Sequence, residues 1–240
     1  MLAKIRNVFR GFKQKWGSAS AKRRMWNREY AVCSWRQEEE AADTALGNLI
    51  RRYARRGNIL DLGCGAGNTV GELSSDTYDR YTGVDVSDVA LEKAAARAQA
   101  NGAGTRSSFQ QSDILNFEPR ESFDVILFRE SVYYVPLRKL RSVLERYAQH
   151  LKEDGVFIVT VFDSTAYGAV LTEIEAHFSV ADKYASQNKS QTILVFRRRP
   201  ANSSETTGHR SVFTVGSLQA VYEYASAECA LPAFLGSLLS

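Results

Sequence analysis

Short apolar runs alternate with amphipathic stretches through the middle of the chain. Apolar runs bounded by turn-forming residues predict five strands, at 58–62, 81–85, 106–110, 123–128 and 155–162. Between them, apolar residues recur at steps of three and four, which predicts helices at 68–75, 88–101 and 136–151. A helix at 166–178 then precedes two strand-like runs, 180–184 and 191–197, which we expect to form a hairpin. These repeated units predict an α/β fold, a doubly wound seven-stranded sheet that is mostly parallel with a C-terminal antiparallel hairpin.

Another helix is predicted just before the first strand. An apolar stripe from Ala42 to Tyr53 follows three glutamates and ends among arginines 51–56, and these charges complement a helix dipole. Gly57 fits the stop of this helix. The arginines therefore indicate a solvated helix end, with an RNA-binding patch as the alternative.

The N-terminal segment is basic and amphipathic. Residues 1–16 place five apolar side chains at helical spacing among lysines and arginines. Three interpretations stay open: packing on the domain, contact with an anionic membrane, and an organellar presequence. The aromatic-rich segment 25–35 is a candidate lid, or it fills a groove. We divide the chain into this segment (1–36), the main domain (37–199) and a linker and tail of unassigned role (200–240).

Charge is distributed unevenly along the chain. Residues 1–36 carry ten Lys or Arg and one acid, Glu29, whereas the whole chain has a net charge of only +4. The remainder is therefore net acidic, so we expect no DNA partner, and RNA is disfavoured. Cys33, Cys64 and Cys229 are odd in number and widely separated, which indicates a reducing compartment. With no spanning or secretory segment predicted, we expect a cytoplasmic protein, with peripheral membrane contact through residues 1–16 left open.

The stretch from 58 to 68 joins the first predicted strand to Gly63, Gly65 and Gly67. Glycines there allow a sharp turn and the close approach of a ligand. A dinucleotide turn has the pattern Gly-x-Gly-x-x-Gly, but here the third glycine comes one residue early. Asp61 would also repel a pyrophosphate and favour an ammonium or a sulfonium. A zwitterionic, adenosine-containing ligand satisfies these demands together.

Carboxylates follow three more of the predicted strands, at the edge where ligands bind in such sheets. Asp85 ends the second strand, where it can hold the two hydroxyls of a ribose. Asp113 follows the third strand and can accept a hydrogen bond from the exocyclic amine of a purine. Glu130 follows the fourth. An Asp at a strand end can also serve only as a turn or cap former.

Four segments in this order resemble class I S-adenosylmethionine-dependent methyltransferases of the small-molecule type. Residues 59–67 resemble the first motif of that family, 83–87 its ribose-binding motif, 111–114 its adenine-contacting motif, and 151–158 the segment leading into its fifth strand. The resemblance covers about residues 36–199 and implies a Rossmann-like fold with S-adenosylmethionine as cofactor. It implies the following cofactor-binding set, with no metal: Asp61, Gly63, Cys64, Gly65, Gly67, Asp85, Val86, Asp113, Ile114 and Arg129.

The acceptor side is less specific. Family members that methylate amides and nucleobase amines carry an Asn/Asp-Pro-Pro-aromatic tetrad where this chain has residues 129–134, Arg-Glu-Ser-Val-Tyr-Tyr, so those acceptors are disfavoured. Glu130 is the candidate catalytic residue: it could deprotonate a hydroxyl, hold an amine, or bond only to the cofactor or a backbone N–H. Trp26, Tyr30, Tyr133 and Tyr134 are candidate substrate-binding residues, with core packing as the alternative for the last two.

These patterns predict an S-adenosylmethionine-dependent methyltransferase that modifies an oxygen or nitrogen of a small molecule or saccharide. An RNA methyltransferase and a non-catalytic S-adenosylmethionine-binding protein are the alternatives. His150, His177 and His209 are not expected to take part in catalysis.

Overall fold

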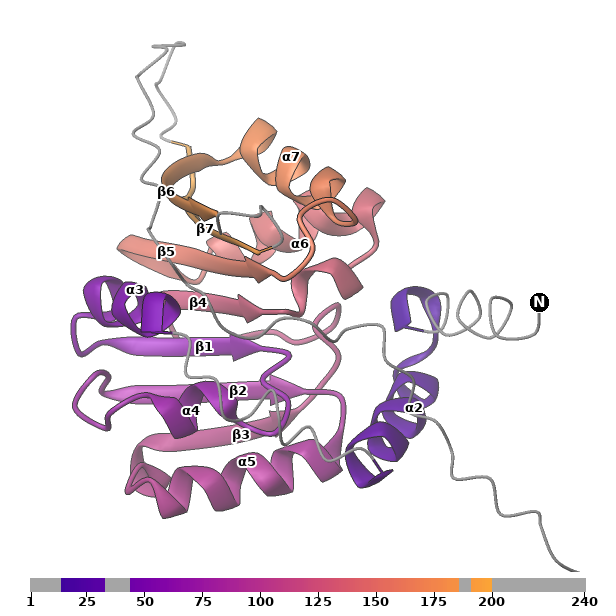
Figure 1. The fold of residues 1–240 in the computed structure, drawn as a ribbon, viewed down its shortest axis with the longest axis vertical. Helices are drawn as coiled ribbons and strands as arrows, with labels where there is room; N and C mark the ends of the chain where they lie inside the picture. Colours follow the sequence, from indigo (N-terminus) through magenta and orange to yellow (C-terminus); the bar gives the residue numbers. More distant parts are fainter. Residues whose placement is uncertain (1–13, 33–43, 186–190, 200–240) are drawn as a thin grey trace, which may run out of the picture.

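The computed structural model describes residues 14–32, 44–185 and 191–199. Its centre is one seven-stranded sheet with the strand order β3-β2-β1-β4-β5-β7-β6 (Figure 1). Strands β1 to β5 pair in parallel, whereas β7 pairs antiparallel with both β5 and β6. The strands are β1 (Asn58–Leu62), β2 (Arg80–Asp85), β3 (Ser107–Gln111), β4 (Phe123–Arg129), β5 (Leu151–Val161), β6 (Ser179–Ala185) and β7 (Thr192–Arg197). The predicted fold class, including the antiparallel hairpin, is confirmed.

Helices cover both faces of the sheet because both faces of its central strands are apolar. On β4, Val125 and Leu127 join one hydrophobic cluster, while Ile126 and Phe128 join the other. The first cluster contains residues of α3 (Thr44–Ala54) and α5 (Asp88–Ala100), with α4 (Asn68–Glu72) on the same side. The second contains residues of α6 (Leu137–Ala148) and α7 (Gly168–His177). Alternate positions of the central strands therefore serve two separate cores.

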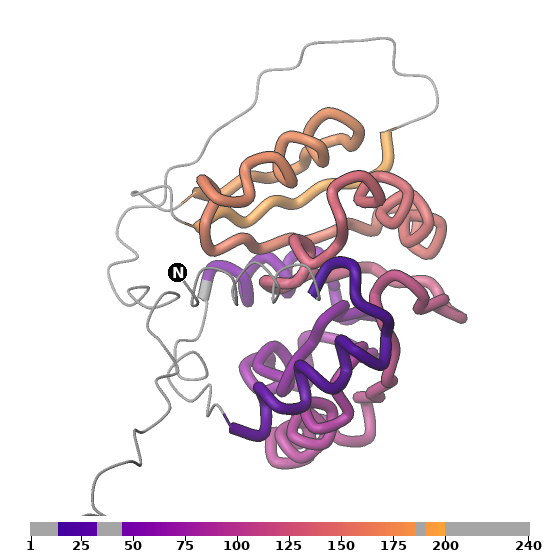
Figure 2. The backbone as a smooth tube through the Cα atoms, turned by 90° about the vertical axis from the view of Figure 1, so that its right-hand side faces the viewer, coloured from indigo at the N-terminus to yellow at the C-terminus, as the bar shows by residue number. Residues whose placement is uncertain are grey.

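Helix α2 (Ala19–Val32) belongs to neither layer. It lies beyond the carboxyl ends of the central strands, where the arrowheads point in Figure 1, and it crosses in front of them in the turned view of Figure 2. It packs against α5. Residues of the aromatic segment predicted as a lid are therefore placed at the ligand-binding edge of the sheet.

The element boundaries differ from the predictions in a few places. Ser87 caps the N-terminus of α5, because its hydroxyl accepts from the N–H of Ala90. The prediction that Gly57 stops the preceding helix is wrong in its cause: Arg55 and Arg56 adopt the left-handed conformation, with φ of 49° and 65°. Gly57 instead provides space, since a Cβ there would lie 1.9 Å from the carboxylate of Asp124.

Several predictions fall outside the described residues: those on 1–13, on Cys33, on the glutamates before α3, on the turn at 186–189, and on the tail with His209 and Cys229. Within the described part, the structure contains no helix both long and apolar enough to cross a membrane. The same part contains no cluster of His, Cys, Asp or Glu arranged to hold a metal ion.

Candidate active site

The glycine-rich loop connects β1 to α4 and turns through left-handed backbone conformations. Gly63, Gly65 and Gly67 have φ angles of 79°, 52° and 80°. A Cβ on Gly63 would lie 2.6 Å from the Cβ of Ser131, and one on Gly65 would lie 2.5 Å from the hydroxyl of Tyr30. Both the conformation and the close neighbours therefore require glycine.

Backbone groups hold this loop against β2. The N–H groups of Gly63 and Cys64 both donate to the carbonyl of Val84, at 2.7 and 3.0 Å. Burial raises the pKa of the Cys64 thiol well above its ordinary value, and the nearby carboxylates of Asp61 and Asp85 raise it further. The thiol therefore stays protonated and is no nucleophile. Any contribution of Cys64 to ligand binding comes from its backbone or its size.

Asp85 ends β2 directly beside the glycine loop. One carboxylate oxygen, Oδ2, accepts from the N–H of Gly65 at 3.0 Å, and Oδ1 accepts from the N–H of Ser87 at 2.8 Å. Burial raises the pKa of Asp85 to about 6, although these two backbone donors oppose the rise. The carboxylate is thus fixed between the loop and the start of α5. Its remaining lone pairs can accept from hydroxyl donors.

Asp61 is fully buried beneath the same loop. Its Oδ2 accepts from the hydroxyl of Tyr81 at 2.5 Å. Its Oδ1 has no hydrogen-bond partner in the described part of the chain. Burial raises the pKa of Asp61 to about 6. A buried carboxylate oxygen without a donor costs free energy, so this site favours a ligand that brings a positive charge or an N–H group.

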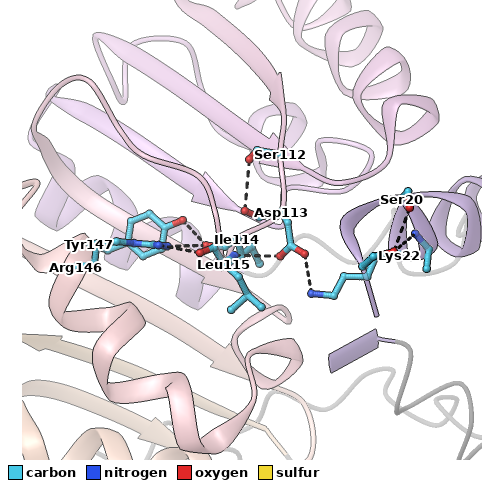
Figure 3. A network of polar contacts seen from close by, with 10 residues as sticks. Ser20, Lys22, Ser112, Asp113, Ile114, Leu115, Arg146 and Tyr147 are labelled. Atoms are coloured by element: carbon cyan, nitrogen blue, oxygen red, sulfur yellow. Dashed lines mark hydrogen bonds and ion pairs between the residues drawn. The ribbon is translucent and has the colours of Figure 1, made fainter. Parts of the chain in front are cut away.

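Asp113 follows β3 and forms an ion pair with α2 (Figure 3). Lys22 Nζ donates to Asp113 Oδ2 at 2.7 Å, and both side chains are buried, at 6% and 8% exposure. The other oxygen, Oδ1, accepts from the N–H of Leu115 at 3.0 Å. Both oxygens of the residue predicted to contact adenine therefore already have a partner. Each still has a second lone pair.

Further polar contacts tie α2 to the first turn of α5. Arg23 pairs with Asp88 through two hydrogen bonds, and Asn27 Nδ2 donates to the same carboxylate at 2.6 Å. The hydroxyl of Ser87 donates to Asn27 Oδ1 at 2.7 Å. Since Ser87 is two residues from Asp85, these contacts bring α2 to the edge of the predicted ribose site.

The remaining predicted cofactor residues occupy the rim. Arg129 makes two hydrogen bonds to the carboxylate of Glu72 on α4, at 2.8 and 3.1 Å. Backbone carbonyls are bonded at Val86, which accepts from Gln111, and at Ile114, which accepts from Arg146 and Tyr147. The side chains of Val86 and Ile114 remain candidates for apolar contact with a ligand.

The predicted acceptor residues gather next to the glycine loop. Glu130 follows β4 with a left-handed φ of 54°. The rings of Tyr133 and Tyr134 are 4.8 Å apart, and Trp26 on α2 lies edge-on to Tyr134 at 5.2 Å. Tyr30 lies 6.2 Å from Trp26, between centroids, with its hydroxyl at the glycine loop. The structure thus brings together the four aromatic residues that the sequence singled out in two distant segments.

Several known proteins that resemble this chain are named as methyltransferases. A family model described as "Methyltransferase domain" matches residues 59–155. The chain is 36% identical over 124 residues to the carboxy-S-adenosyl-L-methionine synthase of Wolinella succinogenes, a match covering 50% of this chain and 49% of that protein. It is 24% identical over 181 residues to the malonyl-[acyl-carrier protein] O-methyltransferase of Bacillus anthracis, covering 70% and 65%.

A solved structure with the same fold is the N-methyltransferase NodS from Bradyrhizobium japonicum WM9 in complex with S-adenosyl-L-homocysteine. Its TM-score is 0.60 at 21% identity, and the superposition covers 74% of this chain and 98% of NodS. The predicted resemblance to class I S-adenosylmethionine-dependent methyltransferases is confirmed over residues 59–155, which match the methyltransferase-domain model. The chain spans about half to two thirds of the length of the curated relatives it matches.

The residues present fit the methyltransferase cofactor. The left-handed glycines leave the backbone open where side chains would otherwise stand. The carboxylate of Asp85 is fixed beside them, and the buried Oδ1 of Asp61 has no hydrogen-bond donor in the described part of the chain. A ribose diol and a cationic amino-acid part would satisfy these two acids respectively.

Sequence reasoning missed the contribution of α2 to this candidate site. The sequence patterns assigned no contact to Lys22, Arg23 or Asn27, and the first two entered only the count of positive charges. The signal was present, because Lys22, Trp26 and Tyr30 recur at steps of four and so share one helical face. Arg23 and Asn27 follow the same step, which places both on the side that meets Asp88.

Proposed function

We propose that this chain is an enzyme that transfers the methyl group of S-adenosylmethionine to an oxygen or nitrogen of a small molecule or saccharide. The observation that carries the proposal is the carboxylate of Asp85, held by the N–H groups of Gly65 and Ser87 beside three left-handed glycines. An N-methyltransferase and an O-methyltransferase are among the similar proteins, which supports both acceptor atoms.

The chain's own residues would act mainly by binding and alignment. When bound, S-adenosylmethionine supplies a methyl carbon already activated by a sulfonium. Asp85 accepts from the ribose hydroxyls, Gly63 and Gly65 let the backbone approach the amino-acid part, and Asp61 opposes its positive charge. Well-aligned reactants gain roughly 7–11 kcal/mol of barrier reduction, so alignment would account for most of the rate. Losing Asp85 should therefore weaken cofactor binding most.

An RNA acceptor is disfavoured by how the basic residues of α2 are used. Lys22 is buried against Asp113, and Arg23 is paired with Asp88. Cations that already neutralise the chain's own acids contribute less to phosphate binding. Salt-dependent RNA binding that is lost on removal of residues 1–36 would count against this part of the proposal.

We also propose peripheral contact with an anionic membrane through residues 1–16. In the described part of this segment, the Trp16 side chain is 38% exposed, and the guanidinium of Arg138 lies 3.9 Å from its ring centroid. Arg138 and Lys139 stand in the first turn of α6, where positive charge opposes the helix dipole, so helix stability does not explain them. Attraction to anionic lipid phosphates would explain these two positive charges.

Vesicle co-sedimentation tests this contact. Binding to phosphatidylglycerol vesicles should exceed binding to phosphatidylcholine vesicles, and both Trp16→Ala and Arg138→Glu should weaken it. Equal binding to the two lipids would contradict the proposal.

The methyltransferase proposal is tested by calorimetry with S-adenosylmethionine and with NAD, followed by an acceptor screen that detects S-adenosylhomocysteine. We expect the first ligand to bind and NAD not to bind, and Asp85→Asn to weaken binding. Binding of NAD alone would overturn the proposal. Cofactor binding without turnover of any acceptor would favour the non-catalytic alternative.

A further inference from the structure

Glu130 has a backbone conformation that glutamate rarely adopts. Its φ of 54° is left-handed, and an L side chain there is strained. Two contacts from β5 and its end fix it: the N–H of Glu130 donates to Thr160 Oγ1 at 3.0 Å, and the N–H of Phe162 donates to Glu130 Oε2 at 2.9 Å. A glycine at this position would avoid the strain. Retaining glutamate under strain points to a role for the carboxylate itself.

One aromatic residue contacts this carboxylate, and it belongs to a cluster of rings. The hydroxyl of Tyr133 donates to Glu130 Oε2 at 3.3 Å. The Tyr133 ring stacks on Tyr167 at 4.1 Å and lies 5.9 Å from Phe162. We call the following residues the aromatic cluster: Trp26, Tyr133, Tyr134, Phe162 and Tyr167. Ring faces attract cations, so the cluster and the carboxylate favour the same kind of ligand.

Arg129 is the one cation whose charge is found to act on Glu130 in the described part of the chain, and its effect is smaller than those of burial and of the hydrogen bonds to the carboxylate. The adjacent Arg129 directs its guanidinium to Glu72, at 2.8 and 3.1 Å. The Glu130 carboxylate receives only neutral donors, from Tyr133, Phe162 and Thr160. Burial raises its pKa above the ordinary value. A partly buried acid in such surroundings is complemented by a cation from outside the chain.

The site lies next to the predicted donor site. The residue after Glu130, Ser131, donates through Oγ to the carbonyl of Leu62 at 2.5 Å, and its Cβ crowds Gly63. Trp26, the member of the aromatic cluster on α2, lies edge-on to Tyr134 with the ring centroids 5.2 Å apart. A ligand held by Glu130 would therefore stand between the glycine loop and α2.

We propose that Glu130 and the aromatic cluster form the acceptor site and that the acceptor is an amine, which enters as an ammonium. This inference rests on the proposed methyltransferase function and narrows it from oxygen or nitrogen to nitrogen. The carboxylate of Glu130 first attracts the ammonium and then accepts one of its protons, which frees the nitrogen lone pair. That lone pair forms the C–N bond to the methyl carbon as the C–S bond breaks, and the electron pair of the broken bond stays on sulfur. The product is the methylated ammonium, and Glu130 returns its proton to solvent.

The test compares three probes that share one aromatic ring: 2-phenylethylamine, 2-phenylethanol and 3-phenylpropionate. Their affinities for the full chain are measured by calorimetry in the presence of S-adenosylhomocysteine. The amine should bind at least about tenfold more tightly than the alcohol, and the acid most weakly, because charge-assisted contacts exceed neutral ones. An alcohol or acid that binds as tightly as the amine would overturn the inference.

Glu130→Gln removes the negative charge but keeps the shape of the side chain and an acceptor for the Phe162 N–H. It should therefore abolish the preference for the amine and leave the affinity for S-adenosylhomocysteine unchanged. Glu130→Asp retains the charge and should retain a preference. Glu145→Gln removes an exposed acid of α6 and is the matched control, expected to behave like the wild type. A wild-type preference in Glu130→Gln would contradict the inference. If the wild type does not bind S-adenosylhomocysteine at all, that result would instead contradict the proposed function.

Discussion

Replacing Lys22 with methionine would remove the positive end of the ion pair that joins α2 to the domain. The two charged atoms are 2.7 Å apart, and the side chains of Lys22 and Asp113 are only 6% and 8% exposed. Removing one partner of a buried pair leaves an uncompensated charge, which costs about 3–5 kcal/mol. Asp113 can regain water only if α2 leaves the surface. We therefore expect Lys22→Met to increase the open population of α2 by roughly two to four powers of ten.

Amide hydrogen exchange measures this opening directly. Protection of residues 19–32 should fall strongly in Lys22→Met, while the amides of β1 and β4 should keep their protection because the cores of the sheet are untouched. Lys22→Met combined with Asp113→Asn should recover part of the loss, since the asparagine is neutral and can still accept from the N–H of Leu115.

Arg23→Met provides the control for this experiment. It breaks an ion pair on the same helix whose members are 45% and 39% exposed, so water can replace the lost partner. Its effect on exchange should be far smaller. Equal protection in the two single variants would refute the argument that the buried pair holds α2 in place.

Three further predictions concern the glycine loop and the acids below it. Asp61 and Asp85 have pKa values raised to about 6. Both carboxyl groups must be ionised, Asp61 to bind a cation and Asp85 to bind a diol. The dissociation constant for S-adenosylhomocysteine should therefore rise about tenfold for each carboxyl group between pH 7 and pH 5. Calorimetry that gives the same affinity at both pH values would contradict this. Tyr81→Phe removes the donor to the ionised form of Asp61, so it should cost about 1.5–3 kcal/mol of unfolding free energy at pH 7 and less at pH 5, where the acid is protonated; urea unfolding at the two pH values measures the difference. Gly67→Ala should destabilise the fold by more than the approximate 1–2 kcal/mol that a left-handed alanine costs, because its Cβ would also lie 2.8 Å from the backbone of α5. Gly102→Ala, at φ 69° with open space around it, should show only the conformational part of that loss.

Local pattern was sufficient for the parallel core because burial on both faces makes these strands continuous apolar runs. β1 occupies the predicted residues 58–62, and β4 extends only one residue beyond its predicted end. β5 was predicted to begin at Gly155 but begins at Leu151. The residues Lys152 to Asp154 near its start are exposed and polar, so they do not extend the apolar run that predicts the strand. Leu151 pairs with Phe123 and Val156 pairs with Val125, so the exposed residues lie within a register shift, which periodicity cannot reveal.

The donor side of the site was predictable for a similar reason: glycine and aspartate at strand ends are constrained by the backbone itself. The pairing of Lys22 with Asp113 was not predictable, since the two residues are 91 positions apart in the sequence. The rings of Tyr133 and Trp26 were identified as aromatic but could not be assigned to one cluster until α2 was placed. Strain at Glu130 is equally invisible in the sequence, because it arises from contacts with β5.

The order of α2 in the chain has a consequence for how the protein reaches its final form. A ribosome synthesises α2 before any of its anchors, and the partners of Asn27 and Lys22 follow 61 and 91 residues later. Contacts this distant in sequence form late, because loop closure must precede them. We therefore expect the helix that is made first to dock last, after the sheet has assembled. Newly made chains would then pass through a stage in which the domain has folded and its ligand edge is still uncovered.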